Sequence, residues 1–505
     1  MTRTISSAAP LRRLALTAVA AAAAVLLAAC ADMSGIHTEA ALRSPQQLGL
    51  GTEPSTADQA ATVAPVDAMW WKALGDERLN QLVDTALADS PNLRAAQARI
   101  GKAWSIAQIA QTAEMPQISG QANVSRNHAS ANGMVPPPLA GNNYSSATAQ
   151  IDGRWSLDLF GKHRAALDAA VGGARAAQAD MDAARVLLAS TVVQTYVQLA
   201  RWQEQETVAK RAIAQREHTL KLVRERYDAG LDTNLEVRQS ESGVPQARVQ
   251  LVQVLEQKQL TQNALAALLG QPTAAASLIA SPMAQLRMPQ FPHQLSAGLL
   301  GRRADIVAAR WRVESVEQSI AEAKAEFYPD INLTAFVGLS SIGLGDFARA
   351  GSRQWGIGPA LSLPIFDAGR LRANLRGKSA DYDVAVEGYN QAVINAVHDV
   401  ADQITSVKSA YAQLPEQQQA EAASQSALDI ANQRYKAGLG TFLNVLSAET
   451  NVLAQRRTTV DIQARILSTN AALAQALGGG YRDQSGDETP ATTLGERSAK
   501  AANAS

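Results

Sequence analysis

The side chains that could perform catalysis or hold a metal ion are few in this sequence and form no recognisable site. No spacing typical of a metal site joins the six histidines, which are His37, His128, His163, His218, His293 and His398. The glycines of residues 338–345 resemble a phosphate-binding loop only superficially, because they lie between two expected strands and precede no helix. We therefore expect no enzymatic activity, no cofactor and no bound metal.

One residue carries a specific chemistry, and it is the only cysteine of the chain, Cys30. It follows a basic segment with Arg3, Arg12 and Arg13 and an apolar, alanine-rich run over residues 14–29. That run is too short for a membrane span and is typical of a secretory signal. Its end resembles the lipobox of bacterial lipoproteins, which implies cleavage before Cys30 and acylation of its thiol and new amino group. A chance cysteine after an ordinary signal is the alternative.

The expected lipid anchor places the protein at a bacterial outer membrane, with its bulk in the periplasm. Each buried methylene adds ~0.8 kcal/mol of membrane affinity, so several acyl chains anchor stably in outer-membrane lipid. Ala31 follows the cysteine, where aspartate usually marks retention at the inner membrane. The net charge is zero, which argues against a nucleic-acid partner. No later segment has ~20 continuous apolar residues, so we expect no transmembrane helix.

The sequence contains one segment twice, as RYDAGLDTNLEVRQSE at residues 226–241 and RYKAGLGTFLNVLSAE at residues 434–449. Nine of the sixteen positions are identical at an offset of 208. Such self-similarity indicates two tandem structural repeats, which we place at residues 66–270 and 296–478. The rest divides into a signal peptide at 1–29, a lipidated linker at 30–65, a second linker at 271–295 and a disordered tail at 479–505.

Four segments alternate between apolar or small residues and polar residues, which is typical of β-strands. In one of them Ile151 and Trp155 share a face, and Gln150 and Asp152 share the other. Each segment has roughly the 9–11 residues that cross a bilayer when tilted. The polar faces favour a water-filled lumen, and two soluble hairpins are the alternative. The four expected strands lie at about 117–128, 145–159, 330–340 and 353–365.

Long helices follow the strands in each repeat. They lack a wide apolar stripe, which suits extended coiled-coil contacts better than one compact core. A stretch of about 70 residues would span ~105 Å as a helix. Pro245 and Pro415 predict kinks or breaks, because proline removes a backbone hydrogen bond at a cost of ~3 kcal/mol. The expected helices cover residues 160–229, 232–269, 368–437 and 441–477.

Four strands cannot close a barrel, and lipid does not tolerate an open sheet edge. Two chains would give eight strands, whose interior fills with side chains, whereas three give twelve and leave a lumen. We therefore expect a fold that is mainly α with membrane β. It is a homotrimer with a 12-stranded outer-membrane β-barrel, four strands per chain, continued by a long periplasmic α-helical barrel.

Several short motifs are specific as a set. They are Trp70-Trp71 with Gly75-Asp76 and Leu79, Ala86-Leu87 before Ser90-Pro91, the segment Trp155 to Lys162, Arg302-Arg303-Ala304-Asp305-Ile306, Phe327-Tyr328-Pro329 and Leu363-Pro364-Ile365-Phe366-Asp367. Over residues 66–480 the chain resembles TolC-like outer membrane factors, in the NodT-type lipoprotein subgroup of RND efflux systems. Ala304 departs from the family, which usually has proline there.

The resemblance implies a passive exit duct of a tripartite efflux pump, which conducts drugs or other toxic small molecules to the exterior. The implied partners are a periplasmic adaptor and an inner-membrane pump of the RND type. Energy coupling would belong to the pump, which fits a chain without a nucleotide motif. A type I protein-secretion duct and a non-channel periplasmic coiled-coil scaffold lipoprotein are the alternatives. The sequence leaves open the exported substrate, the pump and the adaptor.

The resemblance also gives the repeated segment a role. The family's helix turns close the periplasmic mouth and dock the adaptor, so Gly230 and Gly438 mark the expected docking tips. Acidic side chains follow the turns in the family's gate; Glu236 matches the first, whereas Asn444 and Ser447 are uncharged. We hypothesise that three copies of Glu236 form a ring at the mouth. The alternative is an ordinary helix-start acid that stabilises the helix dipole.

Two aromatic residues, Tyr227 and Tyr435, match aromatic positions beside the family's turns. Packing at the turn is favoured over gating for both, and gating remains the alternative. Whether the second half contributes to the gate without acids, and whether the duct rests open or closed, stays open at this point.

Overall fold

A computed structural model of the chain describes residues 33–43, 66–287 and 302–482. The expected signal peptide, Cys30, most of the first linker, the end of the second linker and the tail beyond Arg482 lie outside these residues. The chain divides into two compact units. Unit 1 takes the residues up to 42, 99–177 and 309–389, and unit 2 takes the remainder.

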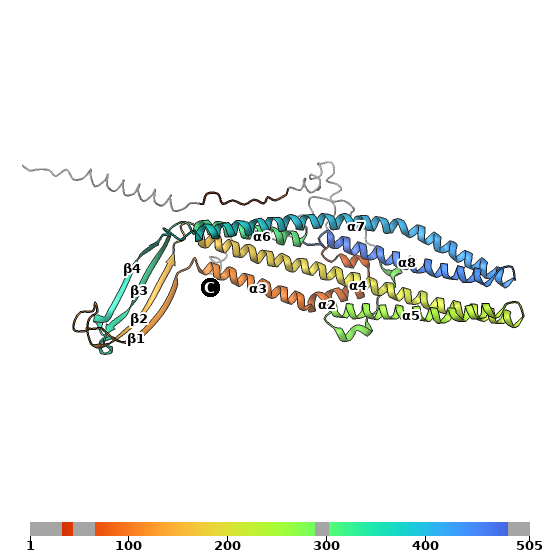
Figure 1. The fold of residues 1–505 in the computed structure, drawn as a ribbon, viewed down its shortest axis with the longest axis horizontal. Helices are drawn as coiled ribbons and strands as arrows, with labels where there is room; N and C mark the ends of the chain where they lie inside the picture. Colours follow the sequence, from red (N-terminus) through yellow and green to blue (C-terminus); the bar gives the residue numbers. More distant parts are fainter. Residues whose placement is uncertain (1–32, 44–65, 288–301, 483–505) are drawn as a thin grey trace, which may run out of the picture. The chain divides into compact units, whose positions relative to one another are not determined.

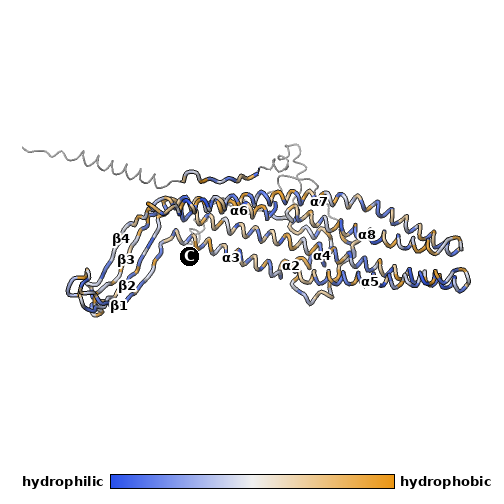
Figure 2. Tube along the Cα trace, viewed as in Figure 1, coloured by the Kyte–Doolittle hydropathy of each residue, from blue (hydrophilic) through white to orange (hydrophobic). Residues whose placement is uncertain are grey.

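Helices make up most of the described chain (Figure 1). Their bounds are α2 (Glu77–Asp89), α3 (Pro91–Thr112), α4 (Lys162–Asp228), α5 (Asn234–Leu268), α6 (Ala304–Ala325), α7 (Arg370–Lys436) and α8 (Phe442–Ala476). The long helices match in length, because α4 and α7 have 67 residues each and α5 and α8 have 35 each. Polar and apolar residues alternate in short runs along them (Figure 2), as expected of helices without a wide apolar stripe.

The two prolines inside the long helices do not interrupt them. Pro245 lies within α5 and Pro415 lies within α7, so of the kink or break predicted at each proline, the break is wrong. The neighbours of each proline explain the continuity. Val244 is buried beside Pro245, and Leu414 packs on a buried cluster around Ile466. Breaking the helix would expose these apolar contacts as well as lose further backbone hydrogen bonds.

Unit 1 contains one antiparallel sheet whose strand order is β1-β2-β3-β4. The strands are β1 (Gln117–His128), β2 (Asn143–Ser156), β3 (Asp330–Ile342) and β4 (Arg353–Ser362). β2 pairs with β3 from Ser146 opposite Ile342 to Ser156 opposite Asn332, so both halves of the chain share the sheet. β2 begins two residues before its expected start and ends three residues before its expected end.

Aspartates end the strands and begin the long helices. The carboxylate of Asp158 accepts hydrogen bonds from the backbone N–H groups of His163 and Arg164, both at 3.0 Å. Asp367 does the same for Gly369 at 2.9 Å and Leu371 at 2.8 Å. A side-chain acceptor at a helix start satisfies N–H groups that have no partner within the helix. This capping explains why β2 stops before Asp158 although the alternating pattern continues.

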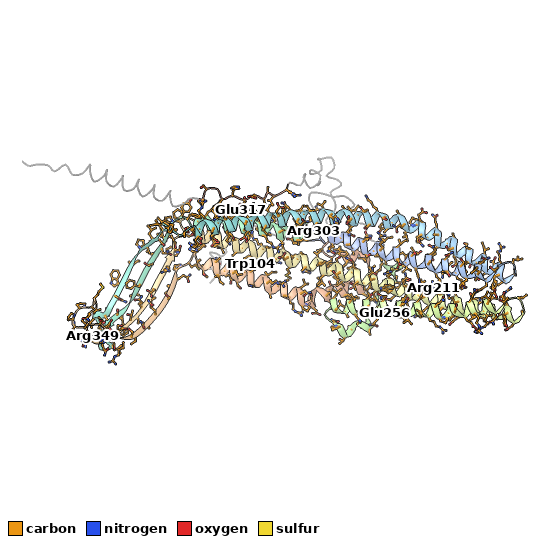
Figure 3. All side chains as sticks on the ribbon, viewed as in Figure 1. Trp104, Arg211, Glu256, Arg303, Glu317 and Arg349 are labelled. Carbon is orange, nitrogen blue, oxygen red and sulfur yellow. The ribbon has the colours of Figure 1, made fainter. Side chains whose placement is uncertain are left out.

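The two faces of the sheet differ in character. Side chains of one face are large, apolar and solvent-exposed, with exposed fractions from 41% to 76%: Ile118, Val124, Ile151, Trp155, Val337, Trp355, Ile357 and Leu361. The opposite face carries mainly polar and small residues, among them Gln121, Gln150 and Gln354, but also the apolar side chains of Phe336 and Ile342. Figure 3 shows side chains along both faces and Arg349 in the connection between β3 and β4, where it pairs with Asp346 at 2.7 Å.

The tryptophan motif belongs to the core of unit 2. Trp70 and Trp71 are buried in one apolar cluster with Leu79 and Tyr196. The hydroxyl of Tyr196 donates to the carboxylate of Asp76 at 2.5 Å, and Asp76 also accepts from the N–H of Arg78 at the start of α2. Burial, together with the bond to Asp76, raises the pKa of Tyr196 to about 12.

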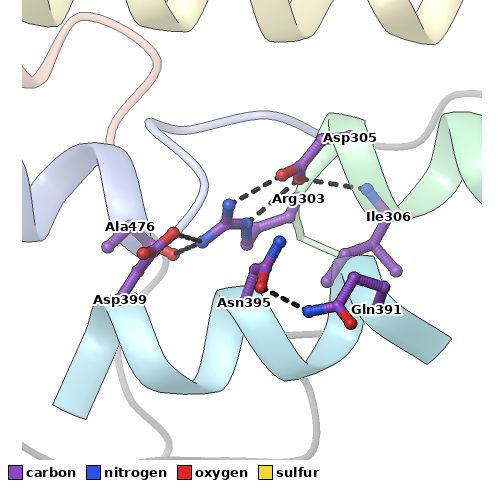
Figure 4. Close-up of polar contacts among 7 residues, drawn as sticks. All are labelled: Arg303, Asp305, Ile306, Gln391, Asn395, Asp399 and Ala476. Carbon is purple, nitrogen blue, oxygen red and sulfur yellow. Dashed lines mark hydrogen bonds and ion pairs between the residues drawn. The ribbon is translucent and has the colours of Figure 1, made fainter. Parts of the chain in front are cut away.

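The arginine motif at the start of α6 ties three segments of unit 2 together (Figure 4). The guanidinium of Arg303 donates to Asp305 at 2.7 and 3.0 Å, to Asp399 of α7 at 3.4 Å and to the carbonyl of Ala476 at 3.2 Å. Ala304 is the first residue of α6. Proline is favoured at such a first position because its ring fixes a helical φ, and here the helix begins with alanine instead.

Within the described ranges, no helix is both long enough and apolar enough to span a membrane. The same residues include no group of three or more His, Cys, Asp or Glu side chains placed to hold a metal ion.

Candidate functional site

The two copies of the repeated segment form two helix-to-helix turns in unit 2. Gly230 and Gly438 have φ of 74° and 72°, in the left-handed region that glycine adopts without strain. The hydrogen bonds match as well. The N–H of each glycine bonds to the carbonyl of Tyr227 or Tyr435, and Leu231 and Leu439 bond one residue further back. This pattern is the usual end of an α-helix at glycine.

The ends of α4 and α7 meet the α4–α5 turn in a largely buried polar cluster, which we call the Asp232 cluster and which consists of Arg226, Asp232 and Tyr435. Arg226 donates from Nε to the carboxylate of Asp232 at 3.1 Å, and the side chains are only 13% and 8% exposed. The hydroxyl of Tyr435 donates to the same oxygen. The guanidinium of Arg226 also lies 4.6 Å from the centre of the Tyr435 ring. The cluster therefore joins the α4–α5 turn to the α7–α8 turn.

Apolar packing supports the Asp232 cluster. Tyr435 is 1% exposed, and its ring lies 6.0 Å from that of Phe442. Val223, Val237 and Val445 are buried in the same apolar cluster. Burial and the hydrogen bond to Asp232 raise the pKa of Tyr435, so the phenol remains protonated and keeps donating. The bonds are part-buried, so they are screened less than bonds at the open surface.

The predicted aromatic pair is thus divided. Tyr435 lies in the joint between the turns, whereas Tyr227, at the same position of the first copy, is 45% exposed. The reason lies at residue 232, because its counterpart in the second copy is Gly440. Glycine has no side chain to accept a hydrogen bond, so the second copy cannot build the same cluster around Tyr227.

Glu236 lies in the first turn of α5 and completes a capping box. Its carboxylate accepts hydrogen bonds from the backbone N–H of Thr233 at 2.9 Å and from the Thr233 hydroxyl. The Thr233 hydroxyl in turn accepts from the N–H of Leu235 at 3.2 Å. The hydrogen bonds from Thr233 hold the pKa of Glu236 below its ordinary value. Glu236 is therefore ionised near neutral pH and held in place by its own helix start.

The second copy starts its helix differently. Thr441 precedes α8 but its side chain makes no capping hydrogen bond, and Asn444 replaces the acid that would complete a box. Asn444 and Ser447 are both exposed. Asn444 thus presents a neutral amide on the surface of α8 where the first copy presents the fixed carboxylate of Glu236, and Ser447 is neutral like its counterpart Gln239.

Sequence reasoning missed Asp232 and Arg226, although the signal was present. Asp232 stands within the repeat at a position where the two copies differ, beside the marked position 236. What the sequence does not reveal is the contact itself, because Asp232 and Tyr435 are 203 residues apart. Only the packing of both turns against each other identifies Tyr435, and not Tyr227, as the partner.

Both turns expose leucines at matching positions. Leu231 and Leu439 are 64% and 71% exposed, and Leu235 and Leu443 are 61% and 64% exposed. Exposed apolar side chains that recur at one place are a common sign of a protein–protein contact. Together, the turns offer a buried polar joint, a fixed carboxylate and two apolar tips, which suit closure and docking but no bond-making chemistry.

Comparison with known proteins agrees with this geometry. The sequence model of a family described as "Outer membrane efflux protein" matches residues 82–271 and 295–479. The multidrug resistance outer membrane protein MdtQ of Escherichia coli O157:H7 is 32% identical over 474 residues, covering 91% of this chain and 96% of MdtQ. The fusaric acid resistance protein FusA of Burkholderia cepacia is 37% identical over 367 residues, covering 71% and 68% of the two chains.

Among solved structures, the outer membrane protein VceC from Vibrio cholerae is similar with a TM-score of 0.78. It is 35% identical, and the match covers 83% of this chain and all of VceC.

The capping box makes a testable difference between the copies. Thr233→Ala removes the hydroxyl that caps α5 and should destabilise the first turn of the helix by about 1 kcal/mol. Amide hydrogens of that turn should then exchange with solvent roughly fivefold faster. Because the pKa of Glu236 is lowered, the cap persists above the ordinary glutamate value of 4.5 and is lost as pH falls through the lowered value. Hydrogen exchange followed by mass spectrometry across pH measures both effects.

Thr441→Ala is the matched control, because its side chain makes no capping bond in α8. Equal acceleration of exchange in both helices, or exchange in α5 that does not respond to acid, would contradict the capping role.

Proposed function

The chain belongs to the outer membrane efflux protein family, so it is an outer-membrane exit duct for efflux and not an enzyme, and from this premise we propose that three copies build the duct. In this proposal each chain contributes four strands to a 12-stranded barrel, and its helices continue the wall in the periplasm. The observation that carries the proposal is the sheet with one exposed apolar face and two unpaired edges.

The sheet's edges support an assembly of several chains. β1 and β4 are the outer strands, and each has only one neighbour in the chain. In lipid, backbone groups without partners cost several kcal/mol each, so both edges need strands from elsewhere. Pairing β4 of one chain with β1 of the next closes the sheet. Three chains are the smallest number that leaves an open lumen.

The segment after the expected anchor supports a lipidated protein. Met33 and Ile36, which follow Cys30 within six residues, pack on the cluster of Phe327 and Leu371 in unit 1. Further on, the N–H groups of Glu39 and Ala40 donate to Asp383 of α7 at 3.0 and 2.9 Å. The chain is therefore held on the unit that contains the sheet. Lipid on Cys30 would then enter the same membrane as the proposed barrel.

The helix turns support contacts with other pump components. The leucines at Gly230 and Gly438 offer two apolar tips per chain, and thus six per trimer. We assign these tips to a periplasmic adaptor, which would connect the duct to an inner-membrane pump of the RND type. Relatives named for resistance to several drugs or to fusaric acid suggest toxic small molecules as the cargo.

The duct itself is tested with the purified, full-length lipoprotein. We expect ion-conducting channels in planar lipid bilayers and a trimer band on gels that shifts to a monomer on heating. A protein that neither conducts nor migrates as a heat-sensitive oligomer would support a scaffold without a channel. If the protein in complex with its natural partners instead carries an unfolded polypeptide across the membrane, the result would favour a protein-secretion duct.

The Asp232 cluster should hold the periplasmic mouth closed. Tyr435→Phe keeps the ring on Phe442 but removes the donor to Asp232, a charge-assisted hydrogen bond worth about 2 kcal/mol. We expect the open fraction to rise by roughly tenfold or more per released joint, seen as higher mean conductance in planar bilayers. Tyr227→Phe, in the exposed counterpart, should leave conductance unchanged. Equal conductance of both variants and the wild type would overturn this role.

The charge of Glu236 can be separated from its capping. Glu236→Gln keeps an acceptor for the capping box and removes the charge, whereas Thr233→Ala weakens the cap and keeps the charge. If three Glu236 side chains ring the mouth, Glu236→Gln should weaken block by multivalent cations by about threefold or more. Thr233→Ala should weaken it far less. Unchanged block in Glu236→Gln would leave capping as the only role.

A further inference from the structure

A chain of hydrogen bonds crosses the polar face of the sheet at mid-height. Gln354 of β4 donates to the amide oxygen of Gln150 in β2 at 2.9 Å. Gln150 donates onward to one carboxylate oxygen of Asp152 at 2.8 Å, and Gln121 of β1 donates to the other at 2.9 Å. We call Gln121, Gln150, Asp152 and Gln354 the amide belt. Gln121 and Gln150 thus donate directly to the carboxylate of Asp152, and Gln354 holds Gln150 in place.

β3 contributes a glycine, Gly338, at the position where the amide belt crosses it. Gly338 lies between Gln150 and Gln354 in the register of the sheet. A Cβ at this position would lie 2.4 Å from the carbonyl oxygen of Ala149 and 2.5 Å from the Cβ of Gln150. Only glycine leaves room there, and the two glutamines meet across it. The belt is therefore continuous over all four strands.

Asp152 is the acid in the middle of this face. The other charged residues of the face are Arg154, two residues along β2, and Asp330, at the helical end of β3. Asp330 is six residues from Phe336, which lies opposite Asp152, so it is about 20 Å away along the strands. That distance exceeds the Debye length of ~8 Å at physiological salt, so Asp330 adds little at the belt.

We propose that Asp152, oriented by the amide belt, is the residue that sets the preference for cations within the barrel part of the duct. The inference rests on the proposed trimeric duct, in which three belts complete one ring. Carboxylate rings favour cations over anions because the charge is fixed where the lumen is narrow and its wall has a low dielectric. Both oxygens of Asp152 are held by amide donors, so the carboxylate cannot turn away from the face.

The test measures the local potential without requiring an open periplasmic mouth. Ser119 lies directly opposite Asp152 on β1 and is exposed, so Ser119→Cys places a thiol beside the carboxylate. In outer-membrane vesicles with the full-length lipoprotein, its reaction rates with a cationic and an anionic methanethiosulfonate reagent are compared. Adding Asp152→Asn should lower the cationic-to-anionic rate ratio by about threefold or more.

Control variants show whether the change in the rate ratio comes from the charge of Asp152. Arg154→Gln should raise the ratio, Asp152→Glu should preserve it, and Asp330→Asn should change it by less than about 1.5-fold because its charge is screened. The same ratio with and without Asp152→Asn would overturn the inference while leaving the duct intact. A Ser119→Cys thiol that reacts with neither reagent, while Ile118→Cys on the apolar face reacts, would instead refute the water-lined barrel.

Discussion

The pairing of β2 with β3 is the interaction on which the rest of the molecule depends. It joins the first half of the chain to the second through a ladder from Ser146 opposite Ile342 to Ser156 opposite Asn332. Because side chains alternate along strands, this register puts most of the apolar residues of both halves on one face, with Phe336 and Ile342 on the other. A slip of one residue would bring Trp155 and Ile151 to the polar face and destroy the amide belt. The same ladder leaves β1 and β4 as the edges of the sheet, which is the feature on which the proposed assembly of several chains rests.

Identical residues in the two copies of the repeat serve different purposes. Glu449 is 3% exposed and accepts hydrogen bonds from Thr219 and Gln215, whereas its counterpart Glu241 is paired with Arg224 and Arg238 at the surface. A buried carboxylate needs such donors, because leaving it without them costs several kcal/mol. The copies thus share a backbone design while one set of side chains packs inside the chain and the other remains available to neighbours.

Much of the fold follows from local pattern. The alternation of residues identified all four strands, and the glycines at 230 and 438 ended helices where expected, because left-handed φ is a local demand. Where the local sequence pattern predicted the wrong helix or strand bounds, contacts in the folded chain explain the difference. Pro245 and Pro415 stay helical because their neighbours are buried, and β2 ends early because Asp158 caps α4. These outcomes depend on contacts that cannot be inferred from the adjacent residues in the sequence.

The candidate site also contains residues that local sequence motifs identify and residues that only the fold identifies. Glu236 could be singled out because the capping box is a local motif, while Asp232 could not, because its partner Tyr435 lies in another helix hairpin. The structure also narrows what Glu236 can do. A carboxylate held by two hydrogen bonds from Thr233 cannot swing into and out of a pore. In the proposed gate, any electrostatic effect of Glu236 at the mouth would therefore come from a fixed charge, and the Asp232 cluster would be the part that moves. Under this proposal, opening would separate the α4–α5 and α7–α8 turns, because Arg226 of the first and Tyr435 of the second both bond to Asp232.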